Sequence, residues 1–150
     1  MPSQSTSTLA LKAAIGHGNG LLAKLLDSLP PEVTARLLAQ ATLHQVDRGA
    51  TIVERGVHSE DIGYVLNGTL AMVQILEDGK KHIVGLLVPT DIYGRVFDGP
   101  LNYRIEALTP VQTISFPRGA LEQILRENPD AERLFLVHLL EGLLSFLLFL

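Results

Sequence analysis

The spacing of apolar residues predicts helices at the start of the chain. Leucines recur at helical spacing over residues 21–29, which predicts a first helix there. Pro30-Pro31-Glu32 opens a second helix, because proline is tolerated in the first turn of a helix. Leu37, Leu38 and Ala41 are the expected buried residues of this second helix.

From Thr42 to Phe116, short apolar runs alternate with turn residues. The runs predict strands over 51–53, 62–66, 69–76, 82–88, 103–108 and 111–116. Many short strands with regular turn signals indicate an all-β sandwich or barrel. Asn67-Gly68 predicts a hairpin with a type I′ turn, because both residues tolerate a positive φ. Asp78-Gly79 predicts a second hairpin.

The helical period returns after Phe116. Residues 118–127 predict a helix with Leu121, Ile124 and Leu125 on one face. Asn128-Pro129-Asp130 then combines a helix-capping residue, a proline suited to the first helical position and an acid in the first turn. A last helix is therefore predicted from Pro129 towards the C-terminus.

This last helix is apolar around most of its circumference. Its non-apolar residues after Arg133 share one stripe: His138, Glu141, Gly142 and Ser145. A helix that is apolar on most sides must be covered on most sides, and we predict a homodimer in which a second copy supplies the cover. The predicted interface residues are Leu136, Leu139, Leu140, Leu143 and Leu147.

Two other ways of covering the apolar surface of the helix remain as alternatives. A transmembrane span is disfavoured because Glu141 would lie in its middle, so no membrane partner is expected. The other is a segment missing from a truncated chain.

Composition narrows the classes of function. The chain has 150 residues, of which 47% are apolar, so it is long enough for one packed domain and is not globally disordered. It has no cysteine, which excludes disulfides and iron–sulfur clusters. Its net charge is −4, and neither C-terminal helix has a basic face for DNA recognition. No secretory signal follows Met1, so a cytoplasmic location is expected.

The residues offer little for catalysis or metal binding. The five histidines are scattered without a pair at i, i+2 or i, i+4, which disfavours a metal site and a haem ligand. No Gly-x-Ser-x-Gly motif is present, and we expect a protein that is not an enzyme. Gly16, Gly18 and Gly20 alternate without a following Lys-Ser/Thr, which favours a flexible linker over a phosphate loop. The cofactor, if there is one, is left open.

An ordered series of turn motifs runs through the β region. The motifs are Arg48-Gly49, Gly56, Gly68, Glu77-Asp78-Gly79, Pro89-Thr90-Asp91-Ile92-Tyr93-Gly94 and Phe116-Pro117-Arg118. The series, with helices at both ends, resembles the sensor domain of the Crp/Fnr family of bacterial transcription regulators over about residues 21–142. Gly-Arg-x-Phe at Gly94, followed later by Phe-Pro-Arg, looks more like the branch that senses oxygen, nitric oxide or redox state, or that is itself controlled by another sensor.

The resemblance implies a fold class and a division of the chain. The fold is mainly β with flanking helices, a double-stranded β-helix (jelly-roll-like) of the cyclic-nucleotide-binding type with a C-terminal dimerisation helix. Residues 1–20 would be a flexible segment, residues 21–128 the β-roll with its flanking helices, and residues 129–150 the dimerisation helix.

The resemblance also implies an effector site. In nucleotide-binding members the segment that begins at Gly94 holds the cyclic phosphate, which suggests a pocket formed by Gly94, Arg95, Asn102, Tyr103 and Arg104. Members that bind cyclic AMP have Gly-Glu-Leu where this chain has Gly94-Arg95-Val96, and Arg-Ser where it has Leu101-Asn102. Binding of cyclic AMP in the usual mode is therefore not expected, and the effector stays unidentified.

In the family a helix-turn-helix domain follows the dimerisation helix. Here residues 144–148 look like the first helix of that domain joined early to the dimerisation helix, so a truncated or gapped chain is a hypothesis. DNA and RNA polymerase would then be contacted only through the missing domain. The alternative is a stand-alone small-molecule-binding or protein-interaction β-barrel without DNA binding, and a non-catalytic metal-binding β-barrel is the third interpretation.

Overall fold

The computed structural model describes residues 11, 15, 20–54, 60–94 and 103–148, with the backbone alone at 143 and 145–148. Two short helices open this part of the chain, α2 (Leu21–Ser28) and α3 (Pro31–Ala39). Eight strands follow: β1 (Thr42–Val46), β2 (Thr51–Val53), β3 (Asp61–Asn67), β4 (Leu70–Ile75), β5 (Lys81–Leu87), β6 (Ile92–Tyr93), β7 (Arg104–Ala107) and β8 (Val111–Pro117). Two helices close it, α4 (Arg118–Glu127) and α5 (Pro129–Leu148).

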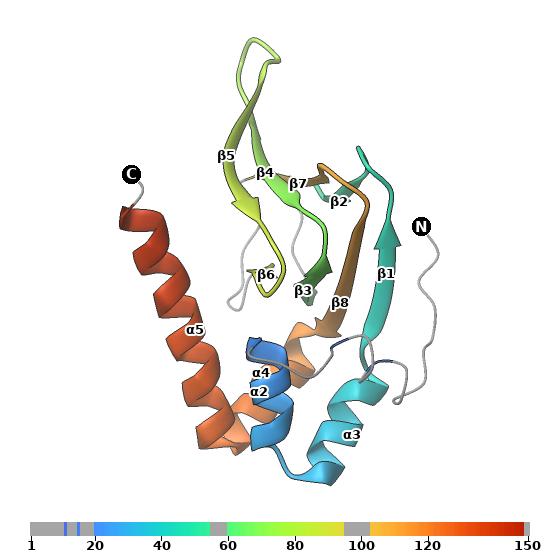
Figure 1. Cartoon of the computed structure of the whole chain (residues 1–150), viewed down its shortest axis with the longest axis vertical. Coiled ribbons are helices and arrows are strands. Elements are labelled where there is room, and N and C mark those ends of the chain that lie inside the picture. The colour runs from blue at the N-terminus through green and yellow to red at the C-terminus, as the bar shows by residue number, and fades with distance from the viewer. Residues whose placement is uncertain (1–10, 12–14, 16–19, 55–59, 95–102, 149–150) are drawn as a thin grey trace.

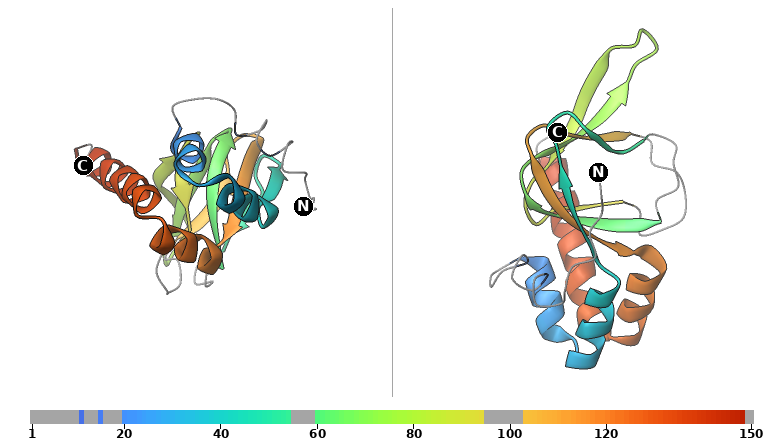
Figure 2. Two further views of the ribbon diagram at one scale, coloured as in Figure 1. Left: turned by 90° about the horizontal axis from the view of Figure 1, so that it is seen from below. Right: turned by 90° about the vertical axis from the view of Figure 1, so that its right-hand side faces the viewer.

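The strands form two antiparallel four-stranded sheets. One sheet has the order β1-β8-β3-β6 and the other has the order β2-β7-β4-β5, so the chain passes repeatedly from one sheet to the other. Helices α2, α3, α4 and the start of α5 gather at one end of the sheets, and α5 then runs along the side where β5 lies (Figures 1 and 2). The predicted fold class, a mainly β jelly-roll-like fold with flanking helices, is confirmed.

Apolar residues fill the space between the two sheets. They come from both sheets because successive residues of a strand point to opposite faces. In β7, for example, Ile105 and Ala107 are buried between the sheets, whereas Arg104 and Glu106 are more accessible. The buried members of this inner core are Val46, Val65, Leu70, Leu87, Tyr93, Ile105, Ala107 and Val111.

A second core joins the helices to the outer face of the β1-β8-β3-β6 sheet. Ile62 and Tyr64 of β3 alternate with the inward residues Gly63 and Val65, and they pack against the helices. Ile114 and Phe116 do the same from β8. The helices contribute residues at helical spacing, among them Leu21, Leu22, Leu25, Leu37, Leu38, Leu121, Ile124, Leu125, Ala131 and Phe135.

One predicted hairpin is wrong and the other is confirmed. β3 and β4 flank Asn67-Gly68 but belong to different sheets, so this turn is a corner between sheets. Gly68 has a φ of +87° while Asn67 does not enter the positive region, which also excludes type I′. At Asp78-Gly79, β4 pairs directly with β5, and Gly79 has a φ of +83°.

Two strands escaped the sequence prediction. β1 carries the polar residues His44 and Gln45, which interrupt the apolar pattern, and it is stabilised by pairing with β8 along its length. β6 has only two residues, too few for a periodic pattern to show. The six predicted strands and the four helices lie within one or two residues of their predicted positions.

Replacing Thr90 by glycine is expected to stabilise the fold. Thr90 has a φ of +81°, a left-handed conformation that β-branched residues rarely adopt. The turn fixes this conformation through hydrogen bonds from Thr90 N–H to Val65 O and from Asp91 N–H to Val88 O, both 2.9 Å long. Thr90→Gly should therefore raise the free energy of unfolding by about 1 kcal/mol and the Tm by a few degrees.

Differential scanning calorimetry checks this prediction, with Thr90→Ala as the control. Alanine keeps the Cβ atom that makes the left-handed region unfavourable, so this variant should show no such gain. A glycine variant no more stable than the alanine variant would contradict the strain argument.

Candidate functional site

The predicted effector residues lie where β6 ends and β7 begins. Gly94 directly follows β6 and has a φ of +102°, so the chain turns sharply there in a conformation suited to glycine. Tyr103 precedes β7 and packs, partly buried, against the inner core. Arg95 and Asn102 lie outside the described residues.

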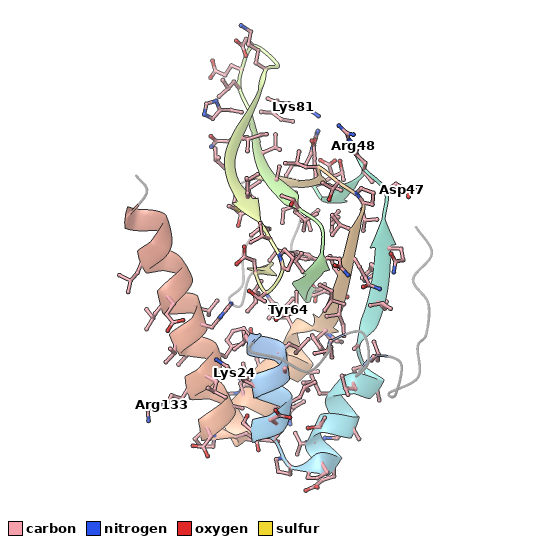
Figure 3. The ribbon with its side chains drawn as sticks, viewed as in Figure 1. Lys24, Asp47, Arg48, Tyr64, Lys81 and Arg133 are labelled. Atoms are coloured by element: carbon pink, nitrogen blue, oxygen red, sulfur yellow. The ribbon has the colours of Figure 1, made fainter. Side chains whose placement is uncertain are left out.

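Arg104 takes part in ion pairs at the accessible face of its strand. Its guanidinium lies 3.2 Å from Glu54 Oε2 and 3.1 Å from Glu106 Oε1. Lys81 Nζ, which points from β5 towards β7, lies 2.9 Å from the same Oε1 of Glu106 (Figure 3). The structure therefore holds the Arg104 side chain among carboxylates, on the face opposite to Ile105 and the inner core.

This network shifts the pKa values of its members. The hydrogen bond to Glu106 raises the pKa of Arg104. Hydrogen bonds from Lys81 and then Arg104 lower the pKa of Glu106 below its ordinary value of 4.5. The carboxylate of Glu106 thus joins Arg104, on its own strand β7, to Lys81 of β5, which lies on the other side of β4.

Replacing Glu106 by glutamine should remove a pH-dependent part of the stability. Because the pKa of Glu106 is lower in the folded chain, its contribution is fully present above the ordinary value of 4.5 and is lost as the pH falls through the folded pKa. The parent chain should exceed Glu106→Gln in free energy of unfolding at neutral pH, with the difference shrinking in acid. Urea titrations of both proteins at several pH values measure this; a difference independent of pH would contradict it.

Polar side chains also lie on the inward face of the β1-β8-β3-β6 sheet. The Tyr93 hydroxyl donates a hydrogen bond to Thr113 Oγ1 at 3.1 Å, and burial raises the pKa of Tyr93. His44 Nε2 lies 2.9 Å from Ser115 Oγ, and burial lowers the pKa of His44. Sequence analysis did not single out these pairs; the alternation of Thr113 and Ser115 with apolar residues in β8 is the signal that could have indicated them.

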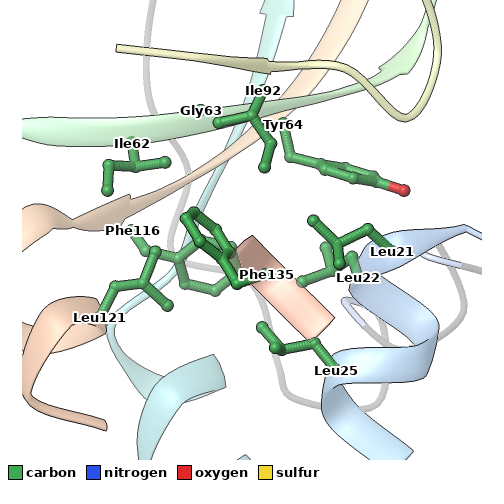
Figure 4. A pocket seen from close by; sticks show the side chains of 10 residues that line it. All are labelled: Leu21, Leu22, Leu25, Ile62, Gly63, Tyr64, Ile92, Phe116, Leu121 and Phe135. Carbon is green, nitrogen blue, oxygen red and sulfur yellow. The ribbon is translucent and has the colours of Figure 1, made fainter. Parts of the chain in front are cut away.

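A small apolar cavity lies between the helices and the outer face of the β1-β8-β3-β6 sheet (Figure 4). Its walls include Tyr64, Phe116 and Phe135, together with leucines of α2. Its volume is about 20 Å³, close to the room that a single water molecule needs. It is therefore a packing gap rather than a site for an effector.

A larger cleft lies between α2 and α5. Its volume is about 350 Å³, and Thr90, from the turn before β6, completes its wall. His138 Nε2 lies 3.1 Å from the backbone oxygen of Thr90, which links α5 to the β-roll at this point. Lys24 and Glu141 also line the cleft. Two residues of the polar stripe predicted on the last helix, His138 and Glu141, thus line a cleft that the sequence pattern did not indicate.

The predicted dimer residues lie on α5. Leu136 and Leu140 are 49% and 58% exposed, and Leu144, one further turn along, is 60% exposed. Leu139 instead packs against the helical core. Leu143 and Leu147 lie in the helical backbone, and their side chains are outside the described part of the structure.

Among the described residues, no three His, Cys, Asp or Glu side chains come together as a metal site. None of the described helices is long and apolar enough to span a membrane.

The sequence is similar to a known domain family and to bacterial transcription regulators. The profile of the cyclic nucleotide-binding domain family matches residues 43–128. The transcriptional activator protein FnrL of Cereibacter sphaeroides is 30% identical over 95 residues, which are 59% of this chain and 38% of the relative. The global nitrogen regulator of Synechocystis is 32% identical over 107 residues, which are 68% of this chain and 46% of the relative.

A solved structure shows the same fold. The sensor domain of the transcriptional regulator DNR from Pseudomonas aeruginosa superposes with a TM-score of 0.69 at 21% identity. The superposition covers 82% of this chain and 86% of that one. The chain spans less than half the length of the two curated relatives.

Proposed function

The chain belongs to the cyclic nucleotide-binding domain family, in its Crp/Fnr branch, and we propose that it is the sensor and dimerisation module of a transcription regulator. In this proposal the β-roll holds the effector, if there is one. Helix α5 pairs with a second copy of the chain and transmits the conformational change that the effector causes. Contacts with DNA and RNA polymerase are made by a part of the regulator outside this chain. The scheme applies to a cytoplasmic homodimer.

The observation that carries the dimerisation proposal is the exposed apolar stripe on α5. Leu136, Leu140 and Leu144 are four residues apart, so their side chains form one row along the helix. Apolar residues in such a row are typical of a helix that packs against another helix. A second α5 related by twofold symmetry would cover both rows with the same contact.

We also propose that the module does not bind cyclic AMP in the usual mode. Arg95 replaces the acid that accepts the ribose hydroxyl in nucleotide-binding members, and Leu101 stands where the phosphate-binding arginine is expected. Arg104 is the nearby cation, but Glu54 and Glu106 already bind its guanidinium. Gly94, Arg95, Asn102 and Tyr103 are therefore our proposed pocket residues, and Arg104, although the sequence suggested it, is left out because its guanidinium is held by these two carboxylates.

Native mass spectrometry of the purified chain tests the dimerisation proposal. A species of twice the chain mass of 16.3 kDa is expected, and any retained small molecule would add to it. A monomer at all accessible concentrations would contradict dimerisation through α5.

Calorimetric titration with cyclic AMP tests the second part. The parent chain should release no binding heat at concentrations where a cyclic-AMP-binding member of the family saturates. A variant that restores the usual residues, Arg95→Glu with Leu101→Arg and Asn102→Ser, should gain binding. Saturable binding by the parent chain would overturn the proposal.

A further inference from the structure

The cleft between α2 and α5 has the size of a ligand site. Its volume of about 350 Å³ lies at the lower end of the roughly 300–1,000 Å³ that is usual for small-molecule pockets. Three segments far apart in the sequence form it: the start of α2, the turn at Thr90 and the middle of α5. Figure 3 shows Lys24 on the side of α2 that is next to α5.

Two opposite charges line this cleft without neutralising each other. Lys24 on α2 and Glu141 on α5 both border it, and neither forms an ion pair with any residue in the described part of the chain. Both side chains are exposed, so solutes can reach them. A ligand that carries both charges could therefore pair with each.

The remaining wall is apolar. Leu21 of α2 and Leu134 and Val137 of α5 line the same cleft. His138 directly follows Val137 on α5 and is held by its contact with the Thr90 oxygen. The cleft thus combines a cation, an anion and an apolar surface within one small volume.

We propose that the α2–α5 cleft binds a free α-amino acid with an apolar side chain. The carboxylate of the amino acid pairs with Lys24, its ammonium pairs with Glu141, and its side chain packs on Leu21, Leu134 and Val137. A simple carboxylate or a phosphate would meet the negative charge of Glu141, and a simple amine would meet Lys24. Only a zwitterion satisfies both groups.

Such a ligand would join α5 to the rest of the roll. Lys24 belongs to α2, which packs on the β-roll, whereas Glu141 lies in the half of α5 beyond its buried N-terminal turns. Binding would therefore favour the present position of α5 over others. This regulatory consequence rests on the proposed function, whereas the binding itself does not.

The test is calorimetric titration of the full chain with leucine, isoleucine, valine, methionine and phenylalanine, each up to about 10 mM. Two analogues of leucine are titrated alongside: 4-methylpentanoate, which lacks the ammonium group, and 3-methylbutylamine, which lacks the carboxylate. At least one of the amino acids should bind, and both analogues should bind at least about tenfold more weakly than leucine or not at all.

Charge-removing variants locate the site. Lys24→Gln and Glu141→Gln should each weaken binding of the best amino acid at least about tenfold. The matched controls Lys80→Gln and Glu77→Gln, on the exposed turn between β4 and β5, should change it less than about twofold. All four residues are exposed, so the variants are expected to fold.

The proposal is overturned if none of the amino acids binds, if 4-methylpentanoate binds as tightly as leucine, or if Lys24→Gln and Glu141→Gln bind as the parent chain does. Native mass spectrometry of the same samples separates this failure from failure of the proposed function. A dimer that binds no amino acid would refute the cleft proposal alone.

Discussion

Replacing Gly63 by alanine will lower the free energy of unfolding by about 3 kcal/mol. Gly63 of β3 pairs with Tyr93 of β6, and the ring of Tyr93 lies across its Cα. A Cβ atom at position 63 would overlap three atoms of that ring. The ring cannot move away easily, because it is buried in the inner core and its hydroxyl donates a hydrogen bond to Thr113 Oγ1. The added methyl group must therefore displace β6 or the core around it.

Urea denaturation measures the loss, and two further variants show its cause. Gly119→Ala is the control, because a Cβ atom at this position in α4 meets nothing within 4 Å and alanine favours the helix. In a Tyr93→Leu background, Gly63→Ala should cost far less than it does alone, because the obstructing ring is gone. An equal cost in both backgrounds would show that the ring is not responsible.

The regular part of the fold could be predicted from the sequence because its signals are local. Strand alternation and helical spacing are patterns of a few residues, and they located the four described helices and six of the eight described strands. The alternation in β7 even separates Arg104 from Ile105, and the structure places these two residues on opposite faces. Glycines that turn the chain, such as Gly79 and Gly94, do have positive φ angles.

The connections between strands could not be predicted in the same way. Asn67-Gly68 has the local chemistry of a hairpin, but whether the next strand pairs back or crosses to the other sheet depends on distant partners. Here β3 pairs with β8 and β6, and β4 pairs with β7 and β5. Gly68 packs tightly against the turn before β8, as a corner requires.

The α2–α5 cleft escaped sequence analysis for a related reason. Its polar groups are Lys24, His138 and Glu141, and more than a hundred residues of sequence separate Lys24 from the other two. On the helix, His138 and Glu141 are visible only as a polar stripe. The fold decides that this stripe faces α2 and Thr90, so that the opposite, apolar stripe remains exposed.

A double variant of that exposed stripe, Leu136→Glu with Leu140→Glu, should convert the expected dimer into a monomer. Each leucine would be covered in the dimer, so each glutamate would have to leave water without a partner and would face its own copy across the twofold axis. We expect the dissociation constant to rise by at least about 100-fold. Native mass spectrometry and sedimentation over a range of concentrations measure this change.

The control for this variant separates the loss of the interface from a general effect of added charge. Leu76→Glu replaces a leucine that is 46% exposed at the start of the β4–β5 turn, away from α5, and it should leave the dimer intact. The double variant should also keep its thermal transition, because neither leucine belongs to a buried core. A double variant that remains dimeric at the same concentrations would show that α5 joins the two copies through another face, or not at all.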